Sequence, residues 1–325
     1  MGNERGLRVL EQYDFKVLST RRGRGSFICE TDQGLKLLTE ATGQGGKLQF
    51  QNQLLHHLRD EGYPRVDCIV ENAEGNLISL DKDETAYMVK DWFEGRECDT
   101  KSEEDIREAA GNLARLHKRM YLPREEKTYL GMPIAEELFR RIRELKKVHS
   151  FILGRQAKSP FERGYLDHYS VFLEQALESV GMLQEASMDE LRQKSLRKGS
   201  LCHGEYNQHH ILMSRAGTAT TDFSKCRYDV QMADLYQFLR KILEKQNWSM
   251  RIGAAILEEY DKENQIGKEE REYLRIRLAF PEKFWKLANY YYNHNKAWIP
   301  GKHMEKLELL TRQLDRRNSF LRMLE

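Results

Sequence analysis

The chain has 325 residues, enough for about two domains at the usual ~100–200 residues per domain. Its composition is 40% hydrophobic and 32% charged, as expected for a globular protein with a buried core. The 53 Lys and Arg residues nearly balance the 51 Asp and Glu residues, so charge favours neither nucleic acid nor an anionic membrane as partner. The N-terminus lacks the apolar run of a signal peptide, and no stretch approaches the ~18 apolar residues of a membrane span.

The five cysteines are odd in number, widely spaced and without a C-x-x-C pair. This pattern argues against a disulfide framework or a zinc knuckle. It predicts reduced thiols in a cytosol-like compartment, most of them acting as small buried hydrophobic side chains.

Residues 1–91 are predicted to form a β-rich N-terminal lobe. Short β-prone runs are separated by turn residues, as in an antiparallel meander; they are FKVLST, SFICET, GLKLLTE, VDCIV, LISL and TAYMVKDW. Between the third and fourth runs, a stripe of leucines from Leu48 to Leu58 predicts one main helix that ends at Gly62.

Residues 92–325 are predicted to form a mostly helical C-terminal lobe. Ser102 and Asp105 have the spacing of a helix cap, and apolar residues then recur with a helical period. The exception is residues 201–228, where Gly, Asn and Asp interrupt short apolar runs. This segment is expected to be a loop with two small strands.

The stretch LCHGEYNQHHIL, residues 201–212, has the composition of a catalytic loop. Kinase-fold phosphotransferases place a carboxylate in such a loop and a metal-binding amide five residues later. Glu205 and His210 have this spacing, and Asp222 follows a short β-prone run where a second metal-binding carboxylate is expected. Asp234 then opens a predicted helix.

A zinc site is the remote alternative for the same stretch, with His203, Glu205, His209 and His210 as ligands. The H-x-E pattern of zinc deaminases also needs a P-C-x-x-C partner, which this sequence lacks. The H-E-x-x-H pattern of metalloproteases is absent as well. A metal-dependent hydrolase is therefore the least favoured of the predicted functions.

Taken in order, these motifs resemble the aminoglycoside phosphotransferase and choline kinase superfamily, and more narrowly the spore-coat CotS family. The segments that carry the resemblance are GLKLL, MVKDWFEGRECD, AAGNLARLH, LCHGEYNQHHIL, TDFSKCRYDVQMADLYQFLRK and FPEKFWKLANYYYNHNKAW. The resemblance implies an α+β, protein-kinase-like two-lobed fold. It pairs a small antiparallel β-rich N-lobe holding one main helix with a large, mostly helical C-lobe.

By position, the resemblance assigns nucleotide-binding roles in the N-lobe. Lys36 matches the lysine that contacts the α- and β-phosphates. Met88, Val89 and Lys90 match the hinge backbone that holds adenine.

The turn RRGRG contains Gly23 and Gly25, which are candidates for the loop that covers the phosphates. It lacks the full G-x-G-x-x-G pattern, so an ordinary hairpin turn stays an equal alternative. The nearby ATGQGGKL does not fit a P-loop, because Ala41 and Leu48 occupy positions that need Gly and Ser or Thr.

In the C-lobe, the resemblance places Glu205 at the catalytic aspartate and His210 at the metal-binding asparagine. Asp222 matches the main magnesium aspartate, while His203 and Asp234 match residues that brace the loop. Glu for Asp adds one methylene, and a misplacement of ~1 Å costs ~10²-fold in rate. His for Asn replaces the oxygen ligand that magnesium prefers with a nitrogen.

The resemblance therefore implies a spore-coat-associated protein with weak ATP- and Mg²⁺-dependent phosphotransfer to the hydroxyl of an unknown small-molecule acceptor. The alternative is a non-catalytic pseudokinase that works as a structural or assembly protein, with other spore-coat proteins as partners. The implied location is the cytoplasm on the mother-cell side, the spore coat, or both, with no nucleic acid and no membrane involved.

Overall fold

A computed structural model of the protein describes residues 5–23, 25–41, 45–124, 129–293 and 300–324. Trp298, at the end of the predicted aromatic segment, lies outside these ranges. The chain divides into two compact units, one made of residues 1–129 with 201–227 and the other of residues 130–200 with 228–325. The lobe boundary between residues 91 and 92 stays a prediction.

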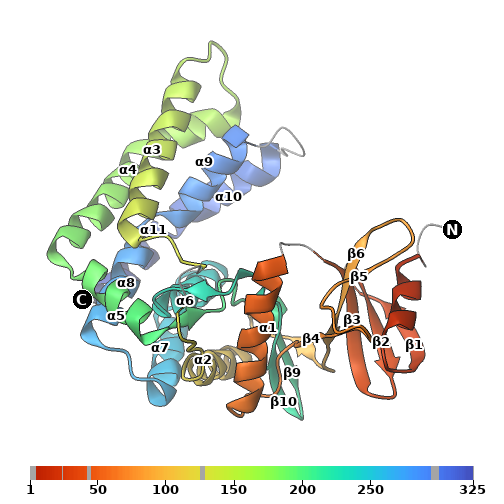
Figure 1. Ribbon diagram of the computed structural model, residues 1–325. Helices are drawn as coiled ribbons and strands as arrows, with labels where there is room; N and C mark the ends of the chain where they lie inside the picture. Colours follow the sequence, from red (N-terminus) through yellow and green to blue (C-terminus); the bar gives the residue numbers. More distant parts are fainter. Residues whose placement is uncertain (1–4, 24, 42–44, 125–128, 294–299, 325) are drawn as a thin grey trace. The chain divides into compact units, whose positions relative to one another are not determined.

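The first unit contains the N-terminal strands, two α-helices and the segment around the predicted catalytic loop (Figure 1). Its elements are η1 (Arg5–Gln12), β1 (Val17–Arg22), β2 (Ser26–Thr31), β3 (Gly34–Glu40), α1 (Gly45–Asp60), β4 (Ile69–Val70), β5 (Ser79–Leu80), β6 (Ala86–Asp91), β7 (Arg96–Glu97), α2 (Glu103–His117), β8 (Leu201–Cys202), η2 (Gln208–His210), β9 (Ile211–Ser214), β10 (Gly217–Thr220) and η3 (Phe223–Lys225). The strand β11 (Arg227–Tyr228) follows at the chain boundary between the units.

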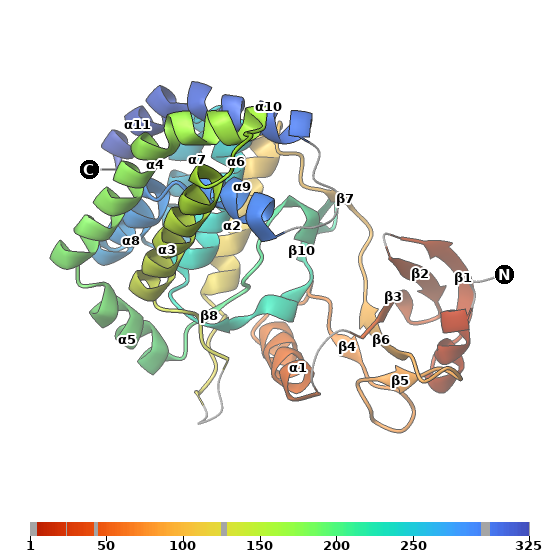
Figure 2. The same cartoon turned by 90° about the horizontal axis from the view of Figure 1, so that it is seen from above.

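The main sheet has the strand order β1-β2-β3-β6-β4, with β5 also paired to β6, and its pairings are antiparallel. On one face, Leu38 and Val89 pack against Val9 and Leu10 of η1. On the other face, Met88 packs with Leu48 of α1. Figure 2 shows these strands side by side with η1 next to them. The predicted β-rich region with one main helix is confirmed.

The start of α2 and the strands that follow the loop at residues 201–210 also agree with the sequence signals. Ser102 caps α2, because its hydroxyl accepts a hydrogen bond from the N–H of Asp105 at 3.2 Å. The strands β9 and β10 form an antiparallel hairpin, and β7 pairs with the outer side of β9. Residues 201–228 therefore contain the short strands β9 and β10, and also β8 and β11, so they hold more strands than the two expected.

The second unit is built of helices that pack along one another, as α3 does with α4 and α4 with α10 (Figure 1). Its helices are α3 (Ile134–Leu153), α4 (Pro160–Glu185), α5 (Met188–Lys198), α6 (Met232–Lys245), α7 (Met250–Glu263), α8 (Lys268–Ala279), α9 (Glu282–Asn293), α10 (Pro300–Arg312) and α11 (Leu314–Met323). In its core, the ring of Phe284 stacks on Tyr165 at 4.8 Å and on Phe172 at 4.3 Å.

Two features of the whole chain bear on the sequence predictions. All five cysteines are buried, and none forms a disulfide in the part of the chain that the structure describes. Among the same residues, no helix combines the length and the apolar character that crossing a membrane requires.

Candidate active site

The loop that carries Glu205 is tied to the segment before Asp222 through His203. The ring of His203 is fully buried, and the N–H of Glu205 donates to its Nδ1 at 3.2 Å. Because Nδ1 accepts, the ring hydrogen must sit on Nε2, which donates to the carbonyl oxygen of Thr221 at 3.0 Å. The bracing role predicted for His203 fits this geometry.

Gly204 allows the loop to pass close to the segment after Asp222. Its φ is +85°, a region that residues with a Cβ rarely adopt. A Cβ at this position would lie 2.2 Å from the carbonyl oxygen of Lys225. Only glycine fits this turn without moving the backbone.

Asn207 holds the second half of the loop and was not predicted from the sequence. Its Nδ2 donates to the carbonyl oxygen of Glu205 at 2.8 Å, and its Oδ1 accepts from the N–H of His209 at 3.0 Å. This pair of bonds closes the turn between Glu205 and His210. Asn is a common turn residue, so the sequence alone does not single out Asn207.

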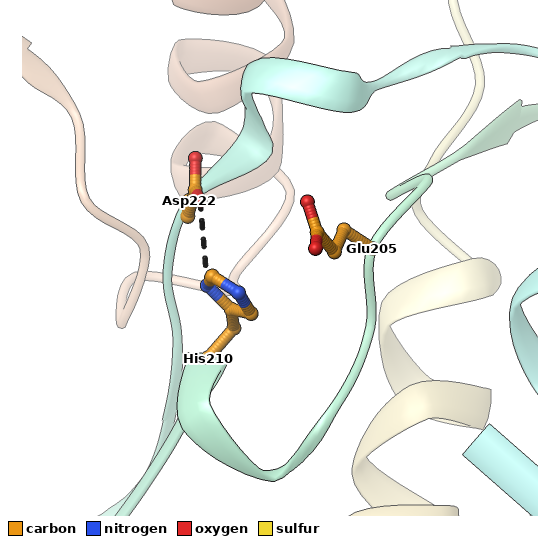
Figure 3. Close-up of side chains that lie close together, drawn as sticks. All are labelled: Glu205, His210 and Asp222. Carbon is orange, nitrogen blue, oxygen red and sulfur yellow. Dashed lines mark ion pairs between the residues drawn. The ribbon is translucent and has the colours of Figure 1, made fainter. Parts of the chain in front are cut away.

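The loop brings Glu205, His210 and Asp222 to one point (Figure 3). One ligand atom from each of the three side chains lies within 4.8 Å of the other two, and all three residues are partly exposed. The Nδ1 of His210 is 3.5 Å from Oδ2 of Asp222. The structure thus brings together the three residues that the spacing singled out.

The ionisation of these groups suits metal binding. Burial lowers the pKa of His210 below its ordinary value, although Asp222 nearby acts against the shift, so the neutral imidazole is favoured at pH 7. Burial raises the pKa of Asp222, but a hydrogen bond with the Ser224 side chain and the charge of Lys90 lower it overall. Two carboxylates and a neutral imidazole form a donor set that fits a divalent cation.

The backbone of Asp222 is in the left-handed region, with φ +62° and ψ +65°. A non-glycine residue in this conformation costs energy and is held by its surroundings. Here the N–H of Asp222 donates to Oδ2 of Asp67 at 3.0 Å. This bond helps to hold the carboxylate of Asp222 beside His210.

The predicted phosphate lysine, Lys36, lies in β3 and pairs with Asp91 at 2.6 Å. It shares a sheet face with Leu38, on the side covered by η1. The structure therefore does not bring Lys36 to the face that packs on α1.

The predicted hinge residues Met88, Val89 and Lys90 lie inside β6. This strand is paired to β3 on one side and to β4 and β5 on the other, so sheet pairing already uses much of its backbone. Residues 92–95, directly after β6, have no regular secondary structure. The adenine-holding role of the three residues stays a prediction.

The remaining predicted residues are placed as follows. Gly23 and Gly25 lie in the turn between β1 and β2, where the N–H of Gly23 donates to the carbonyl oxygen of Ser26 at 2.8 Å and Gly25 has φ +68°. Asp234 is buried in the first turn of α6, in the second unit. Their phosphate-covering and bracing roles stay predictions.

A buried polar network that the sequence did not reveal anchors the site to α2. Asn112 accepts from the hydroxyl of Tyr63 at 2.7 Å and donates to the hydroxyls of Tyr206 and Thr220, each at 3.0 Å. The hydroxyl of Tyr206 donates in turn to the carbonyl oxygen of Ala109 at 2.7 Å. This network fixes the loop and β10 to one helix. The sequence did not indicate this network, because a single Asn in α2 does not show which side chains it will contact.

The helix α1 reaches the segment after Asp222 through Lys47. The ammonium group donates to the carbonyl oxygen of Cys226 and lies over the rings of Phe50 and Tyr129, 4.9 and 4.5 Å from their centres. This contact between a lysine and a carbonyl oxygen therefore links α1 to the segment after Asp222.

With this geometry established, the fold can be placed among solved structures. An aminoglycoside phosphotransferase from Alicyclobacillus acidocaldarius superposes with a TM-score of 0.86 at 20% identity, covering 98% of this chain and 94% of the other. A spectinomycin phosphotransferase in complex with ADP and spectinomycin gives 0.67 at 9% identity, covering 96% and 97%. An amicoumacin kinase in complex with AMP-PNP and Ca²⁺ gives 0.62 at 13%, covering 98% and 94%. The kinase-like fold predicted from the sequence is confirmed.

The sequence comparisons point to a smaller group of proteins than the comparison of folds does. Residues 8–324 match the family described as "Spore coat putative kinase YutH", and the chain belongs to this family. A relative, spore coat protein S of Bacillus subtilis (strain 168), is 24% identical over 96% of this chain and 92% of its own length. The predicted resemblance to spore-coat members of the phosphotransferase superfamily is confirmed.

Proposed function

We propose that this protein binds ATP with one divalent cation and transfers the γ-phosphoryl group slowly to a hydroxyl of a small molecule. The observation that carries the proposal is the meeting of Glu205, His210 and Asp222 within 4.8 Å on a kinase-like fold. The solved neighbours include kinases in complex with ADP or with AMP-PNP and Ca²⁺, which is consistent with this use of the site.

Each residue has a distinct role in the proposed reaction. Glu205 accepts the proton of the acceptor hydroxyl while the hydroxyl oxygen forms its bond to the γ-phosphorus and the bond to the β-phosphate oxygen breaks. Asp222 and His210 hold the cation, which supplies positive charge beside the phosphates. His203 and Asn207 keep the backbone between these side chains in place.

The three metal-binding side chains also suggest which metal ion the site prefers. Magnesium prefers an octahedron of oxygen ligands, whereas imidazole suits later transition metals. We propose that His210 shifts the preference of the site from magnesium towards ions such as cobalt. This follows from its neutral nitrogen lying 3.5 Å from a carboxylate oxygen of Asp222.

A non-catalytic role in the spore coat is the second candidate. Its support is the relative named spore coat protein S, together with Glu205 and His210 at the positions where the resemblance implies Asp and Asn. In that case the partners are other coat proteins rather than an acceptor molecule. Under both candidates we propose a location in the mother-cell cytoplasm, the spore coat, or both.

Thermal unfolding with added ligands distinguishes the two candidates. The melting temperature is measured with millimolar ATP and either Mg²⁺, Co²⁺ or no metal, and again with an Asp222→Asn variant. A ligand at 100 times its dissociation constant adds about 2.7 kcal/mol of stability, which raises the melting temperature by several degrees. We expect a metal-dependent rise in the wild type that the variant loses.

Absence of any rise with ATP and either metal would contradict nucleotide binding and leave the coat-protein role. A rise of equal size in the Asp222→Asn variant would show that nucleotide binds without the proposed metal site.

A further inference from the structure

The face of the main sheet on which each lysine lies follows from strand register. Leu37 pairs with Lys90, and Lys36 pairs with Asp91. Because side chains alternate along a strand, Lys90 shares a face with Met88, which packs on α1, whereas Lys36 lies on the opposite face. Of the two lysines, only Lys90 lies on the α1 side.

Lys90 is held next to Asp222 by Asp67. Its ammonium group donates to Oδ2 of Asp67 at 3.1 Å, and the same oxygen accepts the N–H of Asp222 at 3.0 Å. The side chain of Lys90 is 8% exposed and that of Asp67 is 1% exposed. Two bonds to one carboxylate oxygen therefore connect Lys90 with the backbone of the proposed metal ligand.

The charge of Lys90 is maintained by these neighbours. Burial lowers the pKa of its ammonium group, but Asp67 and Asp222 raise it above the ordinary value overall. Lys90 is therefore a cation at neutral pH, and its charge in turn helps to lower the pKa of Asp222.

This arrangement has unused hydrogen-bonding capacity. An ammonium group has three N–H donors, and Asp67 is the only hydrogen-bond partner of the Lys90 ammonium group within the described ranges. Oδ1 of Asp67 is buried and has no partner there either. Buried polar atoms are normally satisfied, so spare donors beside a metal-binding carboxylate indicate a ligand with acceptor oxygens.

We propose that Lys90, positioned by Asp67, is the cation that contacts the phosphates of a bound nucleotide, in place of Lys36. The inference depends on the nucleotide binding proposed above and assigns the residue that recognises the phosphate groups. The structural alternative is that Lys90 only neutralises Asp67 and Asp222. The proposal and this alternative differ in whether Lys90 contacts the phosphates of the ligand.

The test compares binding of ATP and of adenosine by calorimetry, with Co²⁺ present throughout. Lys90→Met and Lys36→Met are matched variants, because each removes a buried lysine of this sheet that forms an ion pair with an aspartate. We expect Lys90→Met to weaken ATP binding by about 10- to 100-fold, the size of a charge-assisted hydrogen bond, and to leave adenosine binding unchanged. Lys36→Met is expected to change the ATP-to-adenosine ratio of affinities by less than about twofold.

Lys90→Met leaves Asp67 buried without its cation, so the variant is also made together with Asp67→Asn. The double variant is expected to bind adenosine like the wild type and to show the same loss for ATP. An equal loss for ATP and adenosine, wild-type ATP binding in the double variant, or a selective loss in Lys36→Met would each overturn the assignment while nucleotide binding itself stands. If the wild type binds neither ligand, the proposed function fails, and the role of Lys90 fails with it.

Discussion

Glu205 and His210 are the two residues on which the proposed activity depends most. They stand where the resemblance implies an aspartate and an asparagine, and the backbone presents both side chains to Asp222. The loop geometry, held by His203 and Gly204, is thus retained while its chemistry is altered. This combination predicts a site that binds better than it reacts.

Restoring the usual side chains should therefore raise the rate. We expect the double variant Glu205→Asp, His210→Asn to turn over ATP with Mg²⁺ at least ~10-fold faster than the wild type, since misplacement by ~1 Å costs ~10²-fold. Release of ADP in a coupled assay measures the change, and the inactive control carries Asp222→Asn in addition. Turnover that stays at the level of this control would indicate that activity has been lost through other positions as well.

The lowered pKa of His210 predicts a pH-dependent stability in the absence of metal. Its pKa in the folded protein lies below the ordinary 6.5, so the unfolded chain binds more protons between the two values. The free energy of unfolding must then fall as the pH drops from about 7.5 through 6.5 and below. Asp222 contributes only at lower pH, because its own pKa is lowered from 3.8.

Urea unfolding of the wild type and of His210→Asn at pH 7.5 and 5.5 measures this effect. The wild type is expected to lose more stability than the variant on acidification. Burial also lowers the pKa of His149. Because His149 is present in both proteins, its contribution to the loss of stability cancels in the comparison. Equal losses in the two proteins would show that His210 is not held neutral by the fold.

The α2 network is the feature that matters at the level of secondary-structure elements. Asn112 joins the helix to Tyr63, to Tyr206 of the catalytic loop and to Thr220 of β10 through hydrogen bonds of 3.0 Å or less. Removing the amide takes one hydrogen bond from each of three buried hydroxyl groups, which keep their bonds to one another and to Ala109. Each lost bond costs about 0.5–1.5 kcal/mol.

We therefore expect Asn112→Leu to lower the free energy of unfolding by about 2–5 kcal/mol. Asn52→Leu, in α1, is the matched control, because Asn52 is also buried in a helix but its amide oxygen has no hydrogen-bond partner. Urea unfolding is the measurement. Similar costs at the two positions would contradict a special role for the network.

Helices and strands with a clear hydrophobic period were predictable from the sequence. The helix predicted to begin at Asp234 is α6, which has Asp234 in its first turn, and Ser102 caps α2 as the spacing indicated. The helix α5 was not predicted, because its sequence MDELRQKSLRK is largely polar and has few apolar residues to reveal a period. The formation of such a helix depends on tertiary packing, which a local sequence pattern does not show.

The meeting of Glu205, His210 and Asp222 was predictable because it depends on spacing along the chain. The sheet faces on which Lys36 and Lys90 lie were not predictable, because a shift of one residue in a strand reverses the face. Asn207 and Asn112 were missed for a related reason. Their partners are set by the folded chain and leave no pattern in the sequence.

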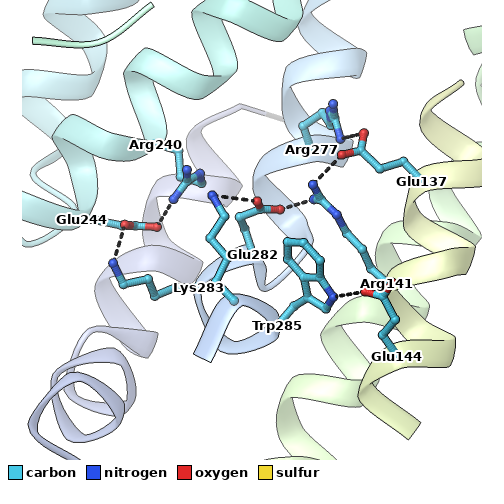
Figure 4. A network of polar contacts seen from close by, with 10 residues as sticks. Glu137, Arg141, Glu144, Arg240, Glu244, Arg277, Glu282, Lys283 and Trp285 are labelled. Carbon is cyan, nitrogen blue, oxygen red and sulfur yellow. Dashed lines mark hydrogen bonds and ion pairs between the residues drawn. The ribbon is translucent and has the colours of Figure 1, made fainter. Parts of the chain in front are cut away.

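A network of buried charges matters for the stability of the molecule as a whole. In the second unit, Glu282 is 5% exposed and pairs with Arg141 and with Lys286 (Figure 4). Burial raises the pKa of Glu282, but these cations lower it overall, so the carboxylate is ionised. Trp285 joins the network by donating from Nε1 to Glu144 at 2.6 Å.

We expect Glu282→Gln to destabilise the protein by about 3–5 kcal/mol, since it removes one of the two carboxylates that pair with the buried Arg141. Glu259→Gln, which alters the exposed pair with Lys262, is the control and should cost less than about 1 kcal/mol. Calorimetric unfolding compares the two. A small cost at Glu282 would mean that the remaining acids of the network compensate for its loss.

At the scale of the whole molecule, the proposed nucleotide and metal residues Lys90, Asp67, Glu205, His210 and Asp222 all belong to the first unit. The most direct test of the account is X-ray diffraction at the cobalt absorption edge from crystals grown with ADP and Co²⁺. We predict an anomalous peak ligated by Asp222 and His210, with Glu205 beside it and the phosphates in contact with Lys90. Crystals containing neither an anomalous peak at these residues nor a nucleotide near them would contradict the account.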